Sequence, residues 1–258
     1  MKLARSASPE FPPLSEPHIV PDRYSIRLAA NAHEVGSALR LRHRVFNVEI
    51  GKQAETSNVS GLEFDAYDFK CRHLIVISNE TNETVGTYRL NSLETAGSAA
   101  GFYSAKEFTI GDLPSEVLQN GIEIGRACIA KEHRNTKVIF LLWKGLLQHL
   151  GSAGKRYFFG CCSMFTQDER LGAAAYKMMV REGHVHPDLG VKPLRNGIDL
   201  TNDIDAKVEL PSLFNMYLRI GAKICSPPMI DREFGTIDFF VVFDVLKMND
   251  KYRRMFSV

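Results

Sequence analysis

The sequence predicts a mixed α/β fold in which a largely antiparallel sheet carries helices on both faces. Three observations lead to this expectation. Short apolar segments typical of strands alternate with segments of helical pattern. Two of the strand segments are separated only by a polar turn, as in an antiparallel hairpin. The 258 residues, 45% hydrophobic and 24% charged, have the composition of an ordinary globular protein with enough length for one large core.

We expect a single domain over residues 25–258, preceded by a flexible leader over residues 1–24. The leader contains five prolines and lacks the apolar run of a signal peptide. The first helix begins after Asn31, a good N-cap residue with Glu34 three positions later, and the helical run ends at Gly51. The segments 73–78 and 84–91, joined by the polar turn "NETNE", form the predicted hairpin.

The second half of the chain alternates strands and helices. The segment "IEIGRACIA" reads as a strand, and the apolar helix that follows it begins at Thr136 and stops at Gly151. A polar stretch over 183–211 is expected to run over the surface near a site. The remaining predicted elements are a strand over 155–165, a helix over 168–182, a short helix over 212–221 and a last strand over 236–246.

Composition and absent motifs exclude several classes of protein. The net charge of +2 gives no support for nucleic-acid binding. No apolar stretch approaches the ~20 residues needed to span a bilayer. The five cysteines lack C-x-x-C spacing, and no signature of a zinc protease, serine hydrolase, P-loop or dinucleotide site is present. We interpret "HVH" (184–186) as a solvated loop rather than a metal site, and Cys161 and Cys162 as packed thiols rather than nucleophiles.

Charged residues interrupt segments that are otherwise apolar. Buried charges are tolerated when they are paired, so a structural ion-pair network is one interpretation of these residues. Three separate segments contributing to one network favour a functional site instead. Gly125 lies where a bulge would bring two of the charges to one side of the strand. The charged residues are Asp65, Asp68, Arg89, Glu123 and Arg126.

The same segments carry a family resemblance that spans roughly residues 40–244. The segments follow one another in the same order as those of the hemolysin-like acyltransferases of the GNAT superfamily, which the chain resembles. This family includes the ornithine-lipid N-acyltransferases. Some of the elements also resemble those of acyl-homoserine-lactone synthases, although the tryptophan that those synthases carry ahead of the aspartate pair is missing. The matching segments are "LRHRVFNVEIG", "FDAYDFKCRHL", "VGTYRL", "GFYSAKEF", "EIGRACI", "LLWKGL", "GCCSMF" and "DREFGTIDFFV".

This resemblance implies the GNAT fold, with a bulge in the "EIGRACI" strand and a slot where that strand splays from its neighbour. An amine attacks a thioester only as the free base, so we expect Glu123, directly or through a water, to accept its proton. Arg89 and Arg126 are expected to orient the acceptor or to hold Glu123 ionised. A backbone N–H near Ala127 or Cys128 is expected to stabilise the oxyanion. By the resemblance, the substrate-binding residues are Arg44, Phe46, Asp65 and Asp68.

The turn "KEHRNTK" points to the acyl donor. It contains no glycine, whereas a pyrophosphate-binding loop is usually glycine-rich, so we expect acyl carrier protein rather than coenzyme A. Arg134 and Lys137 are the predicted donor-binding residues. No bound cofactor and no metal is expected. A rim complementary to an acidic carrier protein is predicted from Arg40, Arg42, Lys131, Arg134 and Lys137.

The leading hypothesis is an N-acyltransferase that joins a long fatty acyl chain, plain or 3-hydroxylated, to the α-amino group of an amino acid in membrane lipid biosynthesis. The resemblance implies that this amino acid is ornithine. Two alternatives stay open: synthesis of another N-acyl amino acid or of a homoserine-lactone-like signal, and a membrane-active lytic protein. The expected location is the cytoplasm. The basic tail "KYRRMFSV" offers peripheral contact with the inner face of the membrane.

Overall fold

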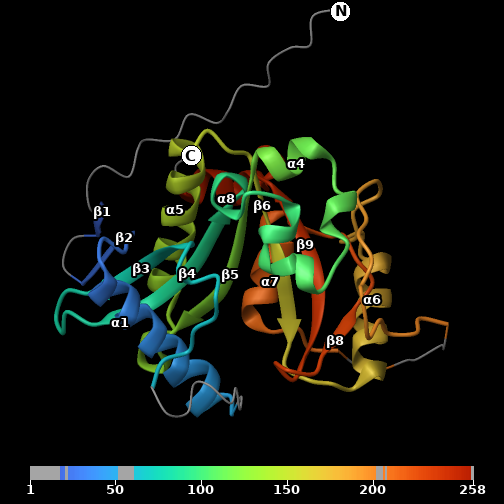
Figure 1. The fold of residues 1–258 in the computed structure, drawn as a ribbon, viewed down its shortest axis with the longest axis horizontal. Helices are drawn as coiled ribbons and strands as arrows, with labels where there is room; N and C mark the ends of the chain where they lie inside the picture. Colours follow the sequence, from blue (N-terminus) through green and yellow to red (C-terminus); the bar gives the residue numbers. More distant parts are fainter. Residues whose placement is uncertain (1–17, 21–22, 52–60, 202–205, 207, 257–258) are drawn as a thin grey trace, which may run out of the picture.

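A nine-stranded sheet runs through the whole protein in a computed structural model, which describes residues 18–20, 23–51, 61–201, 206 and 208–256 (Figure 1). The strand order is β1-β2-β3-β4-β5-β6-β9-β7, with β8 paired to β9. Among the strands in the described part of the chain, only β5 and β6 pair in parallel, and the other neighbours pair antiparallel. The predicted mixed and largely antiparallel sheet is therefore confirmed.

The strands match the expected segments closely where the apolar pattern is long. The predicted hairpin is β3 and β4, which pair antiparallel. The bounds are β1 His18–Val20, β2 Tyr24–Leu28, β3 Arg72–Ser78, β4 Thr84–Ser92, β5 Gly121–Ile129, β6 Tyr157–Met164, β7 Lys223–Ile224, β8 Met229–Asp231 and β9 Thr236–Asp244.

Most of the longer helices also begin where predicted. The Asn31 side chain caps α1 by accepting from the backbone N–H of Glu34. The α-helices are α1 Ala32–Arg42, α3 Leu93–Ala96, α4 Ser115–Gln119, α5 Thr136–Ser152, α6 Glu169–Arg181, α7 Ser212–Ile220 and α8 Asp250–Phe256. The other helical segments are the π-helix η1 His43–Glu49 and the 3-10 turns η2 Ala99–Gly101, η3 Tyr103–Lys106, η4 Ile110–Asp112, η5 Lys131–His133 and η6 Val245–Lys247.

Helices cover both faces of the sheet. On β4, Gly86 faces α5, since a Cβ there would meet Val138 at 3.1 Å. Arg89 lies three residues further on and points to the other face, where its partners Asp65 and Asp68 lie beside α1. The segment from η2 to α4 covers β6 and β9 with a second apolar cluster. Trp143 of α5 is fully buried in the main core, against Phe158, Tyr217 and Phe243.

The sheet forks between β5 and β6. Their parallel pairing extends from Gly121 to Glu123 on β5 and ends at Phe159 on β6. Gly160 lies at the fork, where a side chain is excluded because a Cβ would come within 2.4 Å of the carbonyl oxygen of Ile124. Beyond this point the two strands diverge, as Figure 1 shows for the lower ends of β5 and β6. The slot implied by the family resemblance is therefore present.

A bulge interrupts β5 directly after the fork. Thr87 of β4 pairs with Cys128 and Arg89 with Gly125, so Arg126 and Ala127 together oppose a single residue of β4. Arg126 has φ of +51°, an unusual conformation for a residue with a side chain. The predicted bulge is thus confirmed, but the strained residue is Arg126 rather than its neighbour Gly125.

Both ends of the chain differ from the expectation. Most of the predicted leader lies outside the described residues, but His18–Val20 within it forms β1 and pairs with β2. At the other end the tail forms α8, and Phe256 is buried against Phe140 and Trp143. Among the described helices, none has the length and apolar character to cross a bilayer.

Candidate active site

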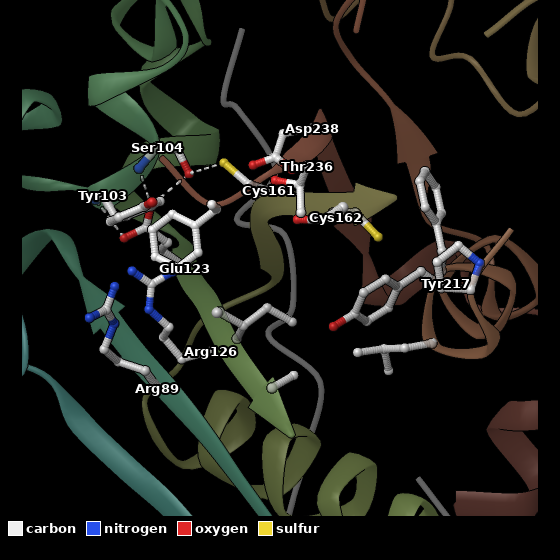
Figure 2. A pocket seen from close by; sticks show the side chains of 18 of the residues that line it. Arg89, Tyr103, Ser104, Glu123, Arg126, Cys161, Cys162, Tyr217, Thr236 and Asp238 are labelled. Carbon is white, nitrogen blue, oxygen red and sulfur yellow. Dashed lines mark hydrogen bonds between the residues drawn. The ribbon is translucent and has the colours of Figure 1, made fainter. Parts of the chain in front are cut away.

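A pocket with a cavity volume of about 140 Å³ opens where β5 and β6 part. Residues from β4, β5, β6, β9, η3 and α7 line it, so most of the fold contributes to one site. Figure 2 shows Arg89, Arg126 and Glu123 at one side, with Thr236 and Asp238 across from them. A smaller apolar cavity between β5 and β6 shares Ile124, Cys161, Cys162 and Tyr217 with the pocket and continues to Trp143. The site therefore joins a charged chamber to an apolar slot.

Three guanidinium groups and three carboxylates form a buried network beside the pocket. Arg89 bonds Asp65 at 2.6 Å and approaches Asp68 at 3.2 Å. Arg126 lies 3.1 Å from Asp65 and 3.2 Å from Glu63. Arg42, the sixth member, bonds Asp68 at 2.6 Å and also pairs with Glu63. The positive and negative groups alternate, which makes burial of all six charges tolerable.

The arginines keep the two aspartates of this network, Asp65 and Asp68, ionised. Burial alone would raise the pKa of Asp65, but Arg89 and Arg126 outweigh burial and hold it below its usual value. Burial would also raise the pKa of Asp68, but the hydrogen bonds from Arg42 outweigh burial and lower it to about 2. Asp65 and Asp68 therefore stay charged beside the arginines at neutral pH.

Two aromatic rings hold the Arg126 guanidinium flat. Its central carbon lies 4.7 Å from the ring centroid of Tyr103 and 4.2 Å from that of Phe234. Only 11% of the side chain is exposed. A guanidinium held in this way presents its N–H groups in a fixed plane, which suits recognition of a carboxylate.

Glu123 belongs to a different set of contacts. Its carboxylate accepts from the backbone N–H of Tyr103 at 2.9 Å and from both the N–H and the hydroxyl of Ser104, at 2.8 and 2.7 Å. Glu123 thus fixes the first turn of η3 against the fork, as the dashed lines in Figure 2 indicate. Any proton that reaches Glu123 has a ready path through the Ser104 hydroxyl.

The thiols of the pocket are protonated, with Cys162 buried and Cys161 half-buried. Sγ of Cys161 lies 3.0 Å from the Glu107 carboxylate and 3.5 Å from the Ser104 hydroxyl. Burial, with the nearby acidic groups, raises the pKa of both Cys161 and Cys162 well above the usual range. A thiol that resists ionisation is a poor nucleophile. The interpretation of both cysteines as packed thiols is therefore supported.

A second acidic group lies beyond Cys161. Carboxylate oxygens of Glu107, Asp231 and Asp238 all lie within 4.8 Å of one another, and all three residues are buried. Burial and the charge of Asp238 raise the pKa of Glu107 to about 8. This spacing could also hold a metal ion, a feature that the sequence analysis did not anticipate.

The structure brings most of the predicted site residues together. Phe46, Arg89, Glu123 and Arg126 line the pocket. Asp65 and Asp68 do not line it but hold its arginines from behind. Arg44 is exposed and does not line the pocket, and Arg42 has the buried position instead.

The predicted donor-binding residues lie together near the start of α5. Arg134 is exposed and forms a bidentate ion pair with Glu49. That pairing, reinforced by Lys131 and Arg44, lowers the pKa of Glu49. Lys137 is exposed, and its backbone N–H donates to the Asn135 side chain. Arg42 was wrongly assigned to this basic rim, since its guanidinium is buried in the ion-pair network.

Several pocket residues were missed by the sequence analysis. Tyr103 and Ser104 lie in the 3-10 turn η3, which is too short to show a periodic pattern, and Glu107 follows directly after it. Asp238 had a usable signal, because it is a charge inside the apolar segment "TIDFFVVFD". The same signal singled out Arg89 and Glu123.

Comparison with known proteins identifies the class to which this fold and site belong. Residues 41–144 match the family described as "Acetyltransferase (GNAT) domain". The forked sheet, the bulge beside the fork and this match define an acyltransferase of the GNAT class.

The relatives narrow the class to one family. The chain is 31% identical to "L-ornithine N(alpha)-acyltransferase" of Brucella abortus (strain 2308), over 88% of this chain and 86% of that protein. It is also 31% identical to the protein of that name from Rhizobium meliloti (strain 1021), over 88% of this chain and 81% of the relative. The chain belongs to the L-ornithine N(alpha)-acyltransferase family.

Solved structures agree with the fold. A CoA-dependent acyl-homoserine lactone synthase, BjaI, has a TM-score of 0.53 at 14% identity, with 91% of this chain and 90% of that chain covered. FeeM, an N-acyl amino acid synthase from uncultured soil microbes, has a TM-score of 0.50 at 10% identity, covering 87% of this chain and 92% of that one. At such low identity these likenesses show the fold alone.

Proposed function

We propose that this protein transfers a long fatty acyl chain from acyl carrier protein to the α-amino group of ornithine, as a step of membrane lipid biosynthesis. The names of its relatives support the acceptor and the atom acylated. The structural observation that carries the proposal is the union of a charged chamber and an apolar slot at the fork of β5 and β6. The charged chamber suits an amino acid, and the apolar cavity of about 20 Å³ beside it marks where an acyl chain would enter between the strands.

In the reaction, the free α-amine attacks the thioester carbonyl, a C–N bond forms, the C–S bond breaks, and the carrier thiol leaves. The α-ammonium must first lose a proton. The Ser104 hydroxyl, which donates to Glu123 at 2.7 Å, is suited to take that proton while passing its own to the carboxylate. Glu123 then acts as the base through Ser104 and also holds the turn that carries it.

The acceptor's carboxylate has a natural partner in Arg126. The rings of Tyr103 and Phe234 fix its guanidinium, which lines the pocket, and Arg89 adds positive charge beside it. Asp65 and Asp68 maintain the positions of both arginines. The roles assigned to the aspartates are therefore support of the arginines rather than direct contact with the substrate.

The bulge in β5 supplies the means to stabilise the oxyanion. After Glu123 the strand has no β6 partner in the described pairing, and at Arg126 and Ala127 its pairing with β4 is also interrupted. A backbone N–H in this segment is suited to meet the tetrahedral oxygen. The acyl chain would follow the apolar cavity lined by Ile124, Trp143 and Phe243.

The start of α5 favours a carrier-protein donor. The Asn135 side chain already accepts from the N–H groups of Lys137 and Val138, which leaves little room for a pyrophosphate at that helix end. The cationic side chains of Arg44, Lys131 and Arg134 gather around Glu49 and are exposed. Such a group suits an acidic carrier protein that presents one phosphate.

The test is a reconstituted reaction with purified protein, acyl carrier protein charged with a 3-hydroxylated or plain long chain, and ornithine. We expect a product whose mass and fragmentation place the acyl chain on the α-nitrogen. Expression in a host that lacks such lipids should produce the same compound in a lipid extract. Acylation of another amino acid in preference to ornithine, or no acylation of any amine, would contradict the proposal.

A further inference from the structure

Asn91 is a polar residue of the pocket that the proposed proton path and carboxylate clamp do not use. It lies on β4 two residues after Arg89, so both side chains are on the same face of the strand. Its neighbour directly across the sheet is Glu123 of β5. Asn91 lines the pocket and is only 4% exposed. It therefore belongs to the wall that carries the proposed base.

One half of the Asn91 amide has no partner. The side-chain NH₂ group donates to the backbone carbonyl of Gly101 at 3.4 Å. The amide oxygen, Oδ1, has no hydrogen-bond partner among the described residues. Turning the amide over would set Oδ1 against the Gly101 carbonyl, with two acceptors facing each other, so the contact with Gly101 decides which atom is left over. A buried acceptor without a donor is uncommon and is explained if a ligand supplies the donor.

The ligand group at Oδ1 must carry an N–H or an O–H. Because Oδ1 only accepts, it cannot bind the acceptor's carboxylate or the thioester oxygen. The acceptor's α-amine carries N–H groups, and the proposed proton path puts this nitrogen at Ser104. Ser104 and Asn91 both adjoin Glu123, the first through a hydrogen bond and the second across the sheet. Figure 2 shows the Glu123 carboxylate between Ser104 and the two arginines.

A neutral amide suits a position beside the attacking nitrogen. A second anion next to Glu123 would stabilise the ammonium form of the acceptor and oppose the loss of the proton that must precede attack. An amide oxygen accepts a hydrogen bond from the ammonium and from the free amine alike. It can therefore hold the nitrogen in place while the proton leaves.

We infer that Oδ1 of Asn91 accepts a hydrogen bond from the α-amine of the acceptor and orients this nitrogen toward the thioester. The inference rests on the proposed function and deepens it. One proton of the α-ammonium passes to Ser104, which gives its own to Glu123, while a second N–H stays bonded to Asn91. With its carboxylate at Arg126, the acceptor is then held at both ends of the reacting unit, which favours a geometry close to attack.

The experiment replaces Asn91 by leucine, which has a similar size but offers no acceptor. Steady-state rates at saturating acyl carrier protein donor give kcat and the KM for ornithine separately. We expect Asn91→Leu to lower kcat at least ~10-fold, because the amine is no longer oriented, and to change KM less than ~3-fold, because Arg126 still binds the carboxylate. Asn91→Ala, which cannot crowd its neighbours, should show the same division between kcat and KM.

Thermal unfolding distinguishes this role from a structural one. An unpartnered acceptor in the interior costs stability, so Asn91→Leu should melt no lower than the wild type. The matched control is Asn120→Leu, since Asn120 lies outside the pocket and its amide donates to the carbonyl of Glu116 at 3.1 Å. This control should keep the kcat and the KM of the wild type.

The results separate the inference from the function on which it rests. If the wild type does not acylate ornithine, the proposed function is wrong and the inference falls with it. If it acylates ornithine and both Asn91 variants keep the wild-type kcat, Oδ1 meets only a water, and the inference is refuted while the function stands. A rise in KM at unchanged kcat would place Asn91 on another part of the acceptor and would refute the inference as well.

Discussion

Glu123 and Arg126 lie three residues apart on β5 but belong to two separate networks. Glu123 holds the backbone and hydroxyl of Ser104, whereas Arg126 pairs with Glu63 and Asp65. The bulge between the fork and Ala127 allows both side chains to line one pocket without neutralising each other. A base path and an anion clamp can thus operate side by side.

The first prediction concerns the proton path. Glu123→Gln and Ser104→Ala should each lower kcat at least ~10-fold, and the double variant should lose little more than the worse single variant, because both act on one proton. Steady-state kinetics at saturating ornithine would measure this. Multiplying losses in the double variant would show that the two residues do not share a path.

The second prediction uses the positive φ of Arg126. Replacement by alanine or glycine removes the guanidinium, so both variants should lose at least ~100-fold in kcat/KM. Glycine adopts φ of +51° without strain, so Arg126→Gly should be more stable than Arg126→Ala by ~1 kcal/mol. Urea unfolding measures the difference. Equal stability would mean that the bulge relaxes when the arginine is lost.

The sequence predicted the framework better than the walls of the site. The cap at Asn31 and the long apolar strands depend on local pattern and were confirmed. Arg44 was assigned to the site by the family resemblance and Arg42 to the rim by its charge, but Arg42 at the end of α1 is buried and Arg44 in the π-helix η1 is exposed. Which of two nearby arginines is buried depends on contacts with Glu63 and Asp68, which no local pattern shows.

The pocket residues Tyr103 and Ser104 were missed for another reason. They lie in the 3-10 turn η3, which is held by Glu123 of β5 and by neighbouring residues packed against β6 and β9, contacts between distant parts of the chain. No local pattern encodes them. A charged residue inside an apolar strand segment was the one sequence signal that marked pocket residues. It marks Asp238 as well as Arg89.

The third prediction concerns stability against pH. The pKa of Glu107 rises on folding from an ordinary 4.5 to about 8, so the folded state binds the extra proton. Its contribution is fully present below pH ~4.5 and is lost as pH rises through about 8. Glu107→Gln lacks this loss. Between pH 5 and 8.5 its free energy of unfolding should therefore rise by ~1–3 kcal/mol relative to that of the wild type. Denaturant unfolding at several pH values measures the difference in unfolding free energy between the variant and the wild type. A difference that stays constant with pH would refute the raised pKa of Glu107.

The fourth prediction concerns the thiols. Cys161→Ala and Cys162→Ala should retain at least about a third of the wild-type kcat, because direct attack by the amine needs no acyl-enzyme and both thiols stay protonated. Mass spectrometry of the protein mixed with donor alone gives an independent reading. An acyl adduct on either cysteine would contradict the proposed direct transfer.

The last prediction concerns the donor. Arg44, Lys131 and Arg134 gather around Glu49 near the start of α5, and a cationic rim speeds encounter with an acidic carrier protein. We therefore expect acyl carrier protein to give a kcat/KM at least ~10-fold above that of the same chain on coenzyme A. The advantage should shrink as salt is raised, because the Debye length falls to ~8 Å near physiological ionic strength.

Arg134→Ala should lower kcat/KM for the carrier-protein donor several-fold at low salt, and less at high salt. Arg170→Ala is the matched control, since Arg170 on α6 is also an exposed arginine in a bidentate ion pair, with the N-cap residue Asp168. It lies outside the group around Glu49. It should leave the preference between donors unchanged. The measurement is the rate with each donor at two salt concentrations. Equal use of the two donors, unaffected by salt and by loss of Arg134, would contradict the predicted preference for acyl carrier protein.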